Sequence, residues 1–370
     1  MDSKKYFPAL SDVMKAEHTL SEILEPTPLQ RNRNLSDRYG ADVLLKREDL
    51  QMVRSYKIRG AYNKIRSLDP QQAQRGVVCA SAGNHAQGVA YSCSKLGIRG
   101  RIFMPVTTPK QKRDQVRMFG GDQVEIVLVG DTFDAANQEA IAQCERDGMV
   151  FIPPFDDPKI IEGQGTVALE VLQEVKESID YVFVPVGGGG LISGVGSVFR
   201  HMSPSTKIIG VEPAGAAGMK ASLAAGHVVT LDEVDKFVDG AAVQTVGSFL
   251  GLGPLQRPVA GKDKALCLNG VQRTLRHFTG GFHIGVNQGL QHGFHTVGHF
   301  LLLFRGQLGK HTVGGRLLGG LFHGLLCLPL LLKLGKVAVD GGNQLMGGGP
   351  DGFKGRPQLF QVFAGTPTGH

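Results

Sequence analysis

Short apolar runs alternate with longer stretches of helical periodicity along residues 42–211. The apolar runs predict strands at residues 42–46, 76–80, 101–105, 124–129, 150–152, 181–186 and 207–211. The stretches between them predict helices, among them 84–95, 109–118, 132–146 and 165–175. This alternation is typical of an α/β fold in which helices cover both faces of a parallel sheet. In such sheets ligands bind beyond the carboxyl ends of the strands, so the loops there are the first candidates for a site.

Length and cysteine usage are typical of an intracellular protein with more than one domain. The chain has 370 residues, which is enough for two or three domains. Its first seventeen residues mix acidic and basic side chains and lack the apolar run of a secretory signal, so we expect a cytoplasmic protein. The five cysteines form no Cys-x-x-Cys pair and are odd in number, which favours free thiols over disulfides or a zinc site.

Composition changes sharply after residue 244. Residues 245–370 hold twelve Lys and Arg, three Asp and no Glu, and they contain eight of the 12 histidines of the chain. Their basic residues are scattered singly, which argues against a nucleic-acid partner. Residues 317–332 are apolar, but His323 and Pro329 interrupt them and the run is short for a membrane span, so no membrane partner is expected.

Lys57 lies in the sequence Val-Arg-Ser-Tyr-Lys-Ile-Arg-Gly of residues 53–60. Taken alone this is an ordinary helix start, in which Ser55 could cap the helix. Most lysines are solvated surface charges, so Lys57 becomes a candidate only through the two segments that follow.

Gly187, Gly188, Gly189 and Gly190 directly follow a predicted strand and open a helix. Such a loop can bring several N–H groups onto one anion, and the helix N-terminus adds positive potential, so a phosphate fits. No Walker lysine and no Gly-x-Gly-x-x-Gly spacing are present, so neither a nucleoside triphosphate nor a dinucleotide is favoured. The alternative is a tight packing turn.

The loop Ser81-Ala82-Gly83-Asn84-His85 also lies between a predicted strand and a helix. Its N–H groups and the Ser81 hydroxyl could bind a carboxylate, and the Asn84 amide could donate to a phenolic oxygen. The alternative is a plain helix N-cap. For His85 a structural role is favoured over a catalytic one.

The order and spacing of these three segments resemble the pyridoxal-phosphate enzymes of the tryptophan-synthase-β type. Within that family the similarity is greatest to threonine dehydratases of the biosynthetic bacterial form. Other matching stretches are residues 45–50, 109–112, 154–157, 163–166 and 210–216. The resemblance extends from about residue 20 to about residue 243.

The resemblance implies a role for each of the three segments. Pyridoxal 5'-phosphate would be carried by Lys57 as a Schiff base, and the freed lysine would remove the substrate Cα proton. Asn84 would bind the ring hydroxyl of the cofactor. Its phosphate would be bound by Gly187, Gly188, Gly189, Gly190 and Leu191, and the amino-acid substrate by Ser81, Gly83, Asn84 and His85.

The implied reaction is deamination of L-threonine to 2-oxobutanoate and ammonia, as in isoleucine biosynthesis, with L-serine as a secondary substrate. The implied assembly is a homo-oligomer. Serine racemases resemble this chain as well, but they use a serine at the position of Ala82, so elimination is favoured here. Their cation site pairs an acid at the position of Glu212 with a second acid, which here is Gly218, so no metal is predicted. A relative of cysteine synthase remains an alternative.

The resemblance also implies two domains with the active site between them. The large domain would comprise residues 1–50 and 150–244, and the small domain residues 51–149. The fold is then expected to be incomplete at the C-terminus, because residues 245–370 lack the family pattern, including the serine that binds the ring nitrogen. A shifted reading frame is favoured over a divergent domain, and an inactive remnant is the alternative function. The tail histidines His283, His292, His295 and His299 lack the spacing of a ligand set.

Overall fold

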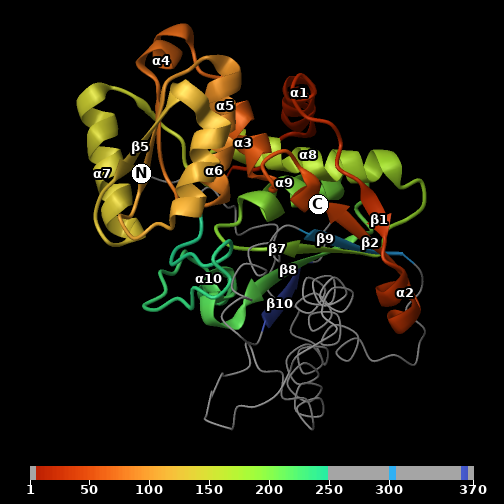
Figure 1. The fold of residues 1–370 in the computed structure, drawn as a ribbon. Coiled ribbons are helices and arrows are strands. Elements are labelled where there is room, and N and C mark those ends of the chain that lie inside the picture. Colours follow the sequence, from red (N-terminus) through yellow and green to blue (C-terminus); the bar gives the residue numbers. More distant parts are fainter. Residues whose placement is uncertain (1–5, 249–299, 306–359, 366–370) are drawn as a thin grey trace, which may run out of the picture.

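The computed structural model describes residues 6–248, 300–305 and 360–365, and its strands form two sheets (Figure 1). The smaller sheet has the strand order β5-β4-β3-β6, and all three of its strand pairs are parallel. Its strands are β3 (Val77–Ala80), β4 (Gly100–Met104), β5 (Val124–Leu128) and β6 (Val150–Phe151). The helices around it are α4 (Pro70–Arg75), α5 (Asn84–Leu96), α6 (Lys110–Gly120) and α7 (Phe133–Asp147), with the short η2 (Gly121–Gln123).

The larger sheet has six strands in the order β1-β2-β9-β7-β8-β10. Its strands are β1 (Leu29–Arg31), β2 (Asp42–Arg47), β7 (Tyr181–Pro185), β8 (Lys207–Pro213), β9 (Phe300–Arg305) and β10 (Phe360–Gly365). The β7–β8 pair is parallel, and the other pairs are antiparallel. The α/β class is confirmed. The larger sheet is nevertheless mixed, because β2, β9 and β10 run antiparallel to their neighbours and are not joined to them by parallel crossovers.

The remaining helices are associated with the larger sheet or connect it to the smaller one. They are α1 (Leu10–Leu20), α2 (Arg33–Tyr39), η1 (Glu48–Leu50), α3 (Lys57–Arg66), α8 (Pro158–Glu174), α9 (Gly190–Met202), η3 (Ala214–Ala216) and α10 (Gly218–Ala225). In Figure 1, α1, α8 and α9 lie together on one side of the larger sheet. The predicted division into residues 1–50 with 150–244 and residues 51–149 stays a prediction.

Helix α8 begins at Pro158, whereas the sequence analysis expected a helix only from residue 165. The expectation was wrong because Gly163 and Gly165 look like helix breakers. The structure shows a strong start instead: the Asp157 carboxylate accepts hydrogen bonds from the N–H groups of Lys159 and Ile160, and Pro158 occupies the first turn. The glycines lie inside the helix, where they allow a close approach of other backbone segments.

Each sheet has its own hydrophobic core. Between the larger sheet and its helices, β7 contributes Val182 and Val184, and α9 contributes Val195 and Phe199. Around the smaller sheet the buried residues include Val77 and Cys79 of β3, Ile102 and Met104 of β4, and Val89 of α5. The loops at the strand ends of each sheet are therefore connected to well-packed strands and helices.

Several expectations concern the tail or the surface of the chain. Strands β9 and β10 were not predicted, because the hydrophobic pattern of residues 245–370 shows no sustained period. The apolar residues 317–332 and the four tail histidines lie outside the described residues.

Among the helices of the described residues, none has both the length and the apolar character needed to cross a membrane. Three cysteines, Cys79, Cys93 and Cys144, are free thiols.

Candidate active site

Lys57 is the first residue of α3, and the loop before it has an unusual conformation. Ser55 is buried, and its Oγ accepts a hydrogen bond from the Lys57 N–H at 3.1 Å. Arg54 has φ 60°, a left-handed conformation that costs a non-glycine residue about 1 kcal/mol. The residues around this loop must hold it in place, and they thereby determine where the Lys57 side chain begins.

The Lys57 amine lies against a short segment that follows β6. Its Nζ donates a hydrogen bond to the backbone oxygen of Pro154 at 2.7 Å and lies 5.9 Å from the centre of the Phe155 ring. The centre of the Tyr56 ring is 5.5 Å from Nζ. Burial lowers the pKa of Lys57 to about 8, because the charged amine loses hydration. About a tenth of the amine is then neutral at pH 7, and the neutral form is the one that attacks an aldehyde.

The glycine loop connects the buried strand β7 to α9. Gly189 has φ 93°, which favours glycine, and it precedes α9 without offering a side chain to the first-turn N–H groups. Such N–H groups have no acceptor within their own helix. An anion at this position would meet these donors together with the positive end of the helix dipole.

Other backbone segments approach this loop closely. A Cβ atom on Gly188 would lie 2.3 Å from ring atoms of Phe155, so a side chain there would displace the ring. On Gly187 a Cβ atom would lie 3.0 Å from the Cα of Ala241. The N–H of Gly247 donates to the backbone oxygen of Gly188 at 3.0 Å. The loop is therefore enclosed by residues 155, 241 and 247, and glycine is required at its centre.

The loop of residues 81–85 connects β3 to α5. The Ser81 Oγ accepts a hydrogen bond from the Gly83 N–H at 3.2 Å, and Gly83 precedes α5 without a side-chain cap. His85 is buried, and its Nε2 donates to the backbone oxygen of Ile152 at 2.9 Å. Burial and the nearby Lys57 lower the pKa of His85 to about 3, so the ring is neutral at physiological pH. Asn84 is half-buried at the first position of α5.

Residues 152–155 contact all three predicted segments. Ile152 accepts from His85, Pro154 accepts from Lys57, and the Phe155 ring covers Gly188. The backbones of α3 and α5 also meet, since a Cβ atom on Gly88 would lie 3.2 Å from the carbonyl carbon of Lys57. The structure thus brings the lysine, the glycine loop and the start of α5 together around one short segment.

This segment was not among the predicted site residues. Residues 154–157 match the family pattern, but no role was predicted for Pro154 and Phe155. The available signal was the Pro153-Pro154 pair directly after a strand, which predicts an extended chain that leaves the sheet edge. Which segments such a chain contacts depends on long-range packing, and spacing along the sequence does not determine it.

Two further positions, Ala82 and Glu212, are those at which the sequence was compared with serine racemases. Ala82, half-buried in the loop before α5, has a methyl side chain that can neither donate nor accept a proton. The two carboxylate oxygens of Glu212 accept the N–H groups of Met219 and Lys220 at 2.8 and 2.9 Å. Burial raises the pKa of Glu212 to about 7, against the opposing effect of these two donors. The described residues hold no cluster of three or more His, Cys, Asp or Glu suited to a metal ion.

These features fit pyridoxal 5'-phosphate. An enclosed lysine with a lowered pKa suits attachment of the aldehyde, and the uncapped N-terminus of α9 suits the phosphate. Glycine at residue 188 leaves room for the Phe155 ring, which lies between the glycine loop and the Lys57 amine. No partner for the ring nitrogen was identified in residues 245–370, and most of that stretch lies outside the described residues.

Comparison with known proteins places this arrangement in a family. Residues 20–252 match the family model described as pyridoxal-phosphate dependent enzyme. The biosynthetic L-threonine dehydratase IlvA of Bacillus subtilis (strain 168) is 55% identical over 235 residues, which are 64% of this chain and 56% of that protein. The chain thus spans about half the length of the curated relatives that it matches.

Solved structures agree with the sequence match. The processed form of threonine deaminase isoform 2 from Solanum lycopersicum is similar with a TM-score of 0.62 and 45% identity, covering 67% of this chain and 73% of that one. Maize serine racemase is similar with a TM-score of 0.62 and 33% identity, covering 67% and 76%. The matched family model covers Lys57 and both loops of the site, and the chain belongs to the pyridoxal-phosphate dependent enzymes.

Proposed function

We propose that this chain catalyses the deamination of L-threonine to 2-oxobutanoate and ammonia, with L-serine as a secondary substrate. The observation that carries the proposal is the position of the Lys57 amine, which donates to Pro154 beside the ring that covers the glycine loop. The similarity to the dehydratase of Bacillus subtilis, 55% identity over 235 residues, supports the choice of reaction.

Lys57 has two tasks in this proposal. Its neutral amine attaches the cofactor, and burial favours that neutral form. When bound, pyridoxal 5'-phosphate supplies an electron sink for charge that develops at the substrate Cα. Once the substrate has displaced it, the Lys57 amine accepts the Cα proton as a general base, for which a pKa near 8 is well suited.

The two helix N-termini have complementary tasks. Gly187, Gly188, Gly189, Gly190 and Leu191 at the start of α9 bind the cofactor phosphate through backbone N–H groups. Ser81, Gly83 and Asn84 at the start of α5 bind the substrate carboxylate, with Asn84 also donating to the ring hydroxyl of the cofactor. His85 holds this loop in place through its hydrogen bond to Ile152. Its neutral, buried ring has little affinity for a proton, so we assign it a structural role and no acid–base role.

Elimination is favoured over racemisation by Ala82. Racemisation needs a group that returns the Cα proton to the opposite face, and a methyl group cannot do so. With one base, the substrate loses its Cα proton to Lys57 and then its β-hydroxyl, and the proton that Lys57 gives up again completes one molecule of water. The enamine product takes water up again and releases ammonia, so that threonine yields one 2-oxobutanoate and one ammonia.

The test uses the full chain purified in the presence of pyridoxal 5'-phosphate. We expect L-threonine to yield 2-oxobutanoate and ammonia in equal amounts, faster than L-serine yields its 2-oxo acid, with no D-allo-threonine or D-serine formed. Conversion of L-serine to D-serine would favour the racemase alternative. Preference for O-acetylserine with a thiol acceptor would favour the cysteine-synthase alternative.

The second candidate is an inactive remnant of such an enzyme. The observation that favours it is coverage, because the chain spans 56% of the dehydratase from Bacillus subtilis and the family pattern ends at residue 252. A remnant would bind the cofactor poorly or fail to fold. A colourless, aggregated product that releases no 2-oxo acid from threonine would select it.

We also infer a cytoplasmic location and a homo-oligomeric assembly. The free thiols of Cys79 on β3 and Cys93 on α5 are buried in the core around the smaller sheet, which suits a reducing compartment. Light scattering after size-exclusion chromatography tests the assembly, and a monomer at micromolar concentration would contradict it.

A further inference from the structure

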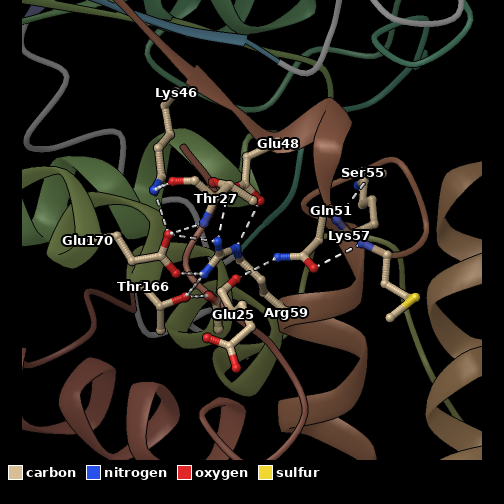
Figure 2. A network of polar contacts seen from close by, with 12 residues as sticks. Glu25, Thr27, Lys46, Glu48, Gln51, Ser55, Lys57, Arg59, Thr166 and Glu170 are labelled. Carbon is tan, nitrogen blue, oxygen red and sulfur yellow. Dashed lines mark hydrogen bonds and ion pairs between the residues drawn. The ribbon is translucent and has the colours of Figure 1, made fainter. Parts of the chain in front are cut away.

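Two positive and two negative side chains are buried together next to the start of α3 (Figure 2). Lys46, Arg59 and Glu48 are 0%, 1% and 2% exposed, and the side chain of Glu170 is 10% exposed. They come from β2, α3, η1 and α8. We refer to Lys46, Glu48, Arg59 and Glu170 as the ion cluster, and its formal charge is zero.

The Arg59 guanidinium uses all of its donors within this cluster and its neighbour Thr166. Nε and Nη2 donate to the two Glu48 oxygens at 2.9 and 2.8 Å, and Nη1 and Nη2 donate to the two Glu170 oxygens at 2.5 and 3.0 Å. Nη1 also donates to the Thr166 Oγ at 3.1 Å. An arginine has five N–H donors, so its orientation is fully determined. Burial opposes the charge of Arg59, but the two carboxylates outweigh it and the net shift of its pKa is upward.

Thr27 closes the other side of the ion cluster. Its hydroxyl donates to Glu48 at 2.5 Å, its N–H donates to Glu170 at 3.3 Å, and its carbonyl oxygen accepts from the Lys46 Nζ at 2.5 Å. Lys46 also pairs with Glu170 at 2.6 Å. The cluster is therefore a closed network in which each charged group meets an opposite charge and further hydrogen bonds.

The ion cluster joins the two ends of the loop that leads to Lys57. Glu48 precedes this loop, and Arg59 follows it as the second residue after Lys57. Within the loop, the Gln51 side chain accepts the Met52 N–H at 2.9 Å, and Arg54 has its left-handed conformation. The bidentate Arg59–Glu48 pair therefore closes a short stretch of chain whose backbone is strained on its own.

Stability alone gives a poor account of four buried charges. The desolvation penalty of a buried ion is large, and apolar residues of similar volume usually stabilise a protein as well or better. A network of fixed geometry, in contrast, defines the orientation of the elements that carry it. Here those elements are the start of α3, the end of β2 and the C-terminal part of α8.

We infer that the ion cluster is a positioning device for Lys57, with Arg59 and Glu48 as its main positioning residues. It fixes the first turn of α3 against β2 and α8, so that the Lys57 amine meets Pro154 beside the glycine loop. Neither Arg59 nor Glu48 touches the amine. The inference rests on the proposed function of Lys57 as the cofactor-bearing residue.

The test removes one charge of each sign with Arg59→Met/Glu48→Gln. This variant keeps the charge balance, since Lys46 remains paired with Glu170, and the glutamine still accepts from Thr27. We expect it to unfold at nearly the same urea concentration as the parent chain. We expect its affinity for pyridoxal 5'-phosphate to fall at least tenfold. The matched control is Arg31→Met/Asp42→Asn, which removes an ion pair of 2.6 Å on β1 and β2 whose side chains are 51% and 32% exposed.

A second readout needs no cofactor. The rate of acetylation of Lys57 in the cofactor-free chain, followed by mass spectrometry against pH, gives the midpoint of its titration. We expect the midpoint to move from about 8 in the parent chain toward the higher value of the urea-unfolded chain, because the displaced amine gains water. The control variant should keep the parental midpoint.

The outcomes separate positioning from a merely structural role. Parental cofactor affinity and an unchanged Lys57 midpoint in the double variant would overturn the inference. If the double variant fails to fold, Arg59→Lys replaces it, because this change keeps the charge and removes the planar fork. Parental affinity and midpoint in a folded Arg59→Lys chain would overturn the inference equally. If the parent chain takes up no cofactor, the proposed function fails, while the acetylation midpoints still test the ion cluster.

Discussion

A backbone oxygen and an aromatic ring form the immediate surroundings of the Lys57 amine. The Pro154 oxygen accepts from the amine, and Phe155 covers Gly188, where a side chain would collide with its ring. Burial is the cause of the lowered pKa of Lys57, with no carboxylate contributing to it. The amine therefore depends on how tightly the surrounding segments enclose it.

The uptake of pyridoxal 5'-phosphate should depend on pH through this amine. Burial disfavours the charged form, so the pKa of Lys57 lies near 8 and the neutral fraction grows as the pH rises toward that value. Below pH 8 we expect the uptake rate of the cofactor-free chain to rise about tenfold per pH unit, and above about pH 9 it should be constant. Stopped-flow absorbance measures the rate.

The reference for this experiment is free lysine whose α-amine is blocked by acetylation, under the same conditions. Its amine titrates near 10.4, so its reaction with the cofactor should keep accelerating above pH 9. An uptake profile of the chain that follows free lysine through this range would show that Lys57 is not enclosed.

Gly188→Ala should weaken cofactor binding by tenfold or more. Its Cβ atom would lie 2.3 Å from the Phe155 ring, so the ring or the glycine loop must move. Phe155→Ala removes the obstacle, and the double variant Gly188→Ala/Phe155→Ala should therefore bind no more weakly than Phe155→Ala alone. Dissociation constants from cofactor fluorescence measure the effect, and additive losses in the double variant would refute the steric explanation.

At the level of elements, α3 and α8 approach so closely that glycines form their contact. A Cβ atom on Gly163 would lie 2.6 Å from the Arg59 oxygen and 2.7 Å from the Gly60 Cα. On Gly60 it would lie 2.6 Å from the Gln164 Nε2. This contact brings the helix that begins with Lys57 against the helix that carries Glu170 of the ion cluster.

Gly163→Ala should destabilise the chain by about 1–3 kcal/mol, because backbone atoms of α3 cannot yield to the added methyl group. Gly196→Ala in α9 is the matched control. Its Cβ atom would lie 3.6 Å from Ile208, and alanine is the better helix former, so it should be neutral or stabilising by up to about 1 kcal/mol. Urea unfolding followed by circular dichroism compares the two, and equal effects would contradict the packing account.

The elements of the smaller sheet were predictable because their signals are local. A short apolar run predicts β3, and Gly97 in the left-handed conformation ends α5 as expected from its position. The start of α8 was not predictable from periodicity. Gly163 and Gly165 are present because other elements pack closely against them, and some of these contacts are with residues more than a hundred positions away along the chain. The same limit applies to Pro154 and Phe155, whose partners are set by packing.

At the scale of the whole molecule, the larger sheet draws its strands from distant parts of the chain. β9 pairs with β2 over six residues and separates it from β7, and β10 pairs with β8 at the edge. Residues 6–248 alone would leave β2 and β7 without the strand between them. The local pattern of the tail gave no indication of this pairing, because a strand position in a sheet depends on its neighbours more than on its own sequence.

A chain that ends after residue 248 should therefore associate through its open strand edges. We expect most of it in large aggregates after size-exclusion chromatography, whereas the full chain elutes as a defined species. The smaller sheet is complete without the tail, so far-ultraviolet circular dichroism should still show helix. A truncated chain that is soluble, uniform and cooperatively folded would contradict the pairing of β9 with β2 and β7.

The central claim is that Lys57 is the residue that bears the cofactor. The full chain is incubated with pyridoxal 5'-phosphate, treated with borohydride to fix the bond between amine and aldehyde, and digested with trypsin. A modified Lys57 resists cleavage, so the account predicts one labelled peptide spanning residues 55–59, absent from Lys57→Ala and present in the Lys95→Ala control. Label distributed over other lysines, or retained in Lys57→Ala at the parental level, would contradict the account.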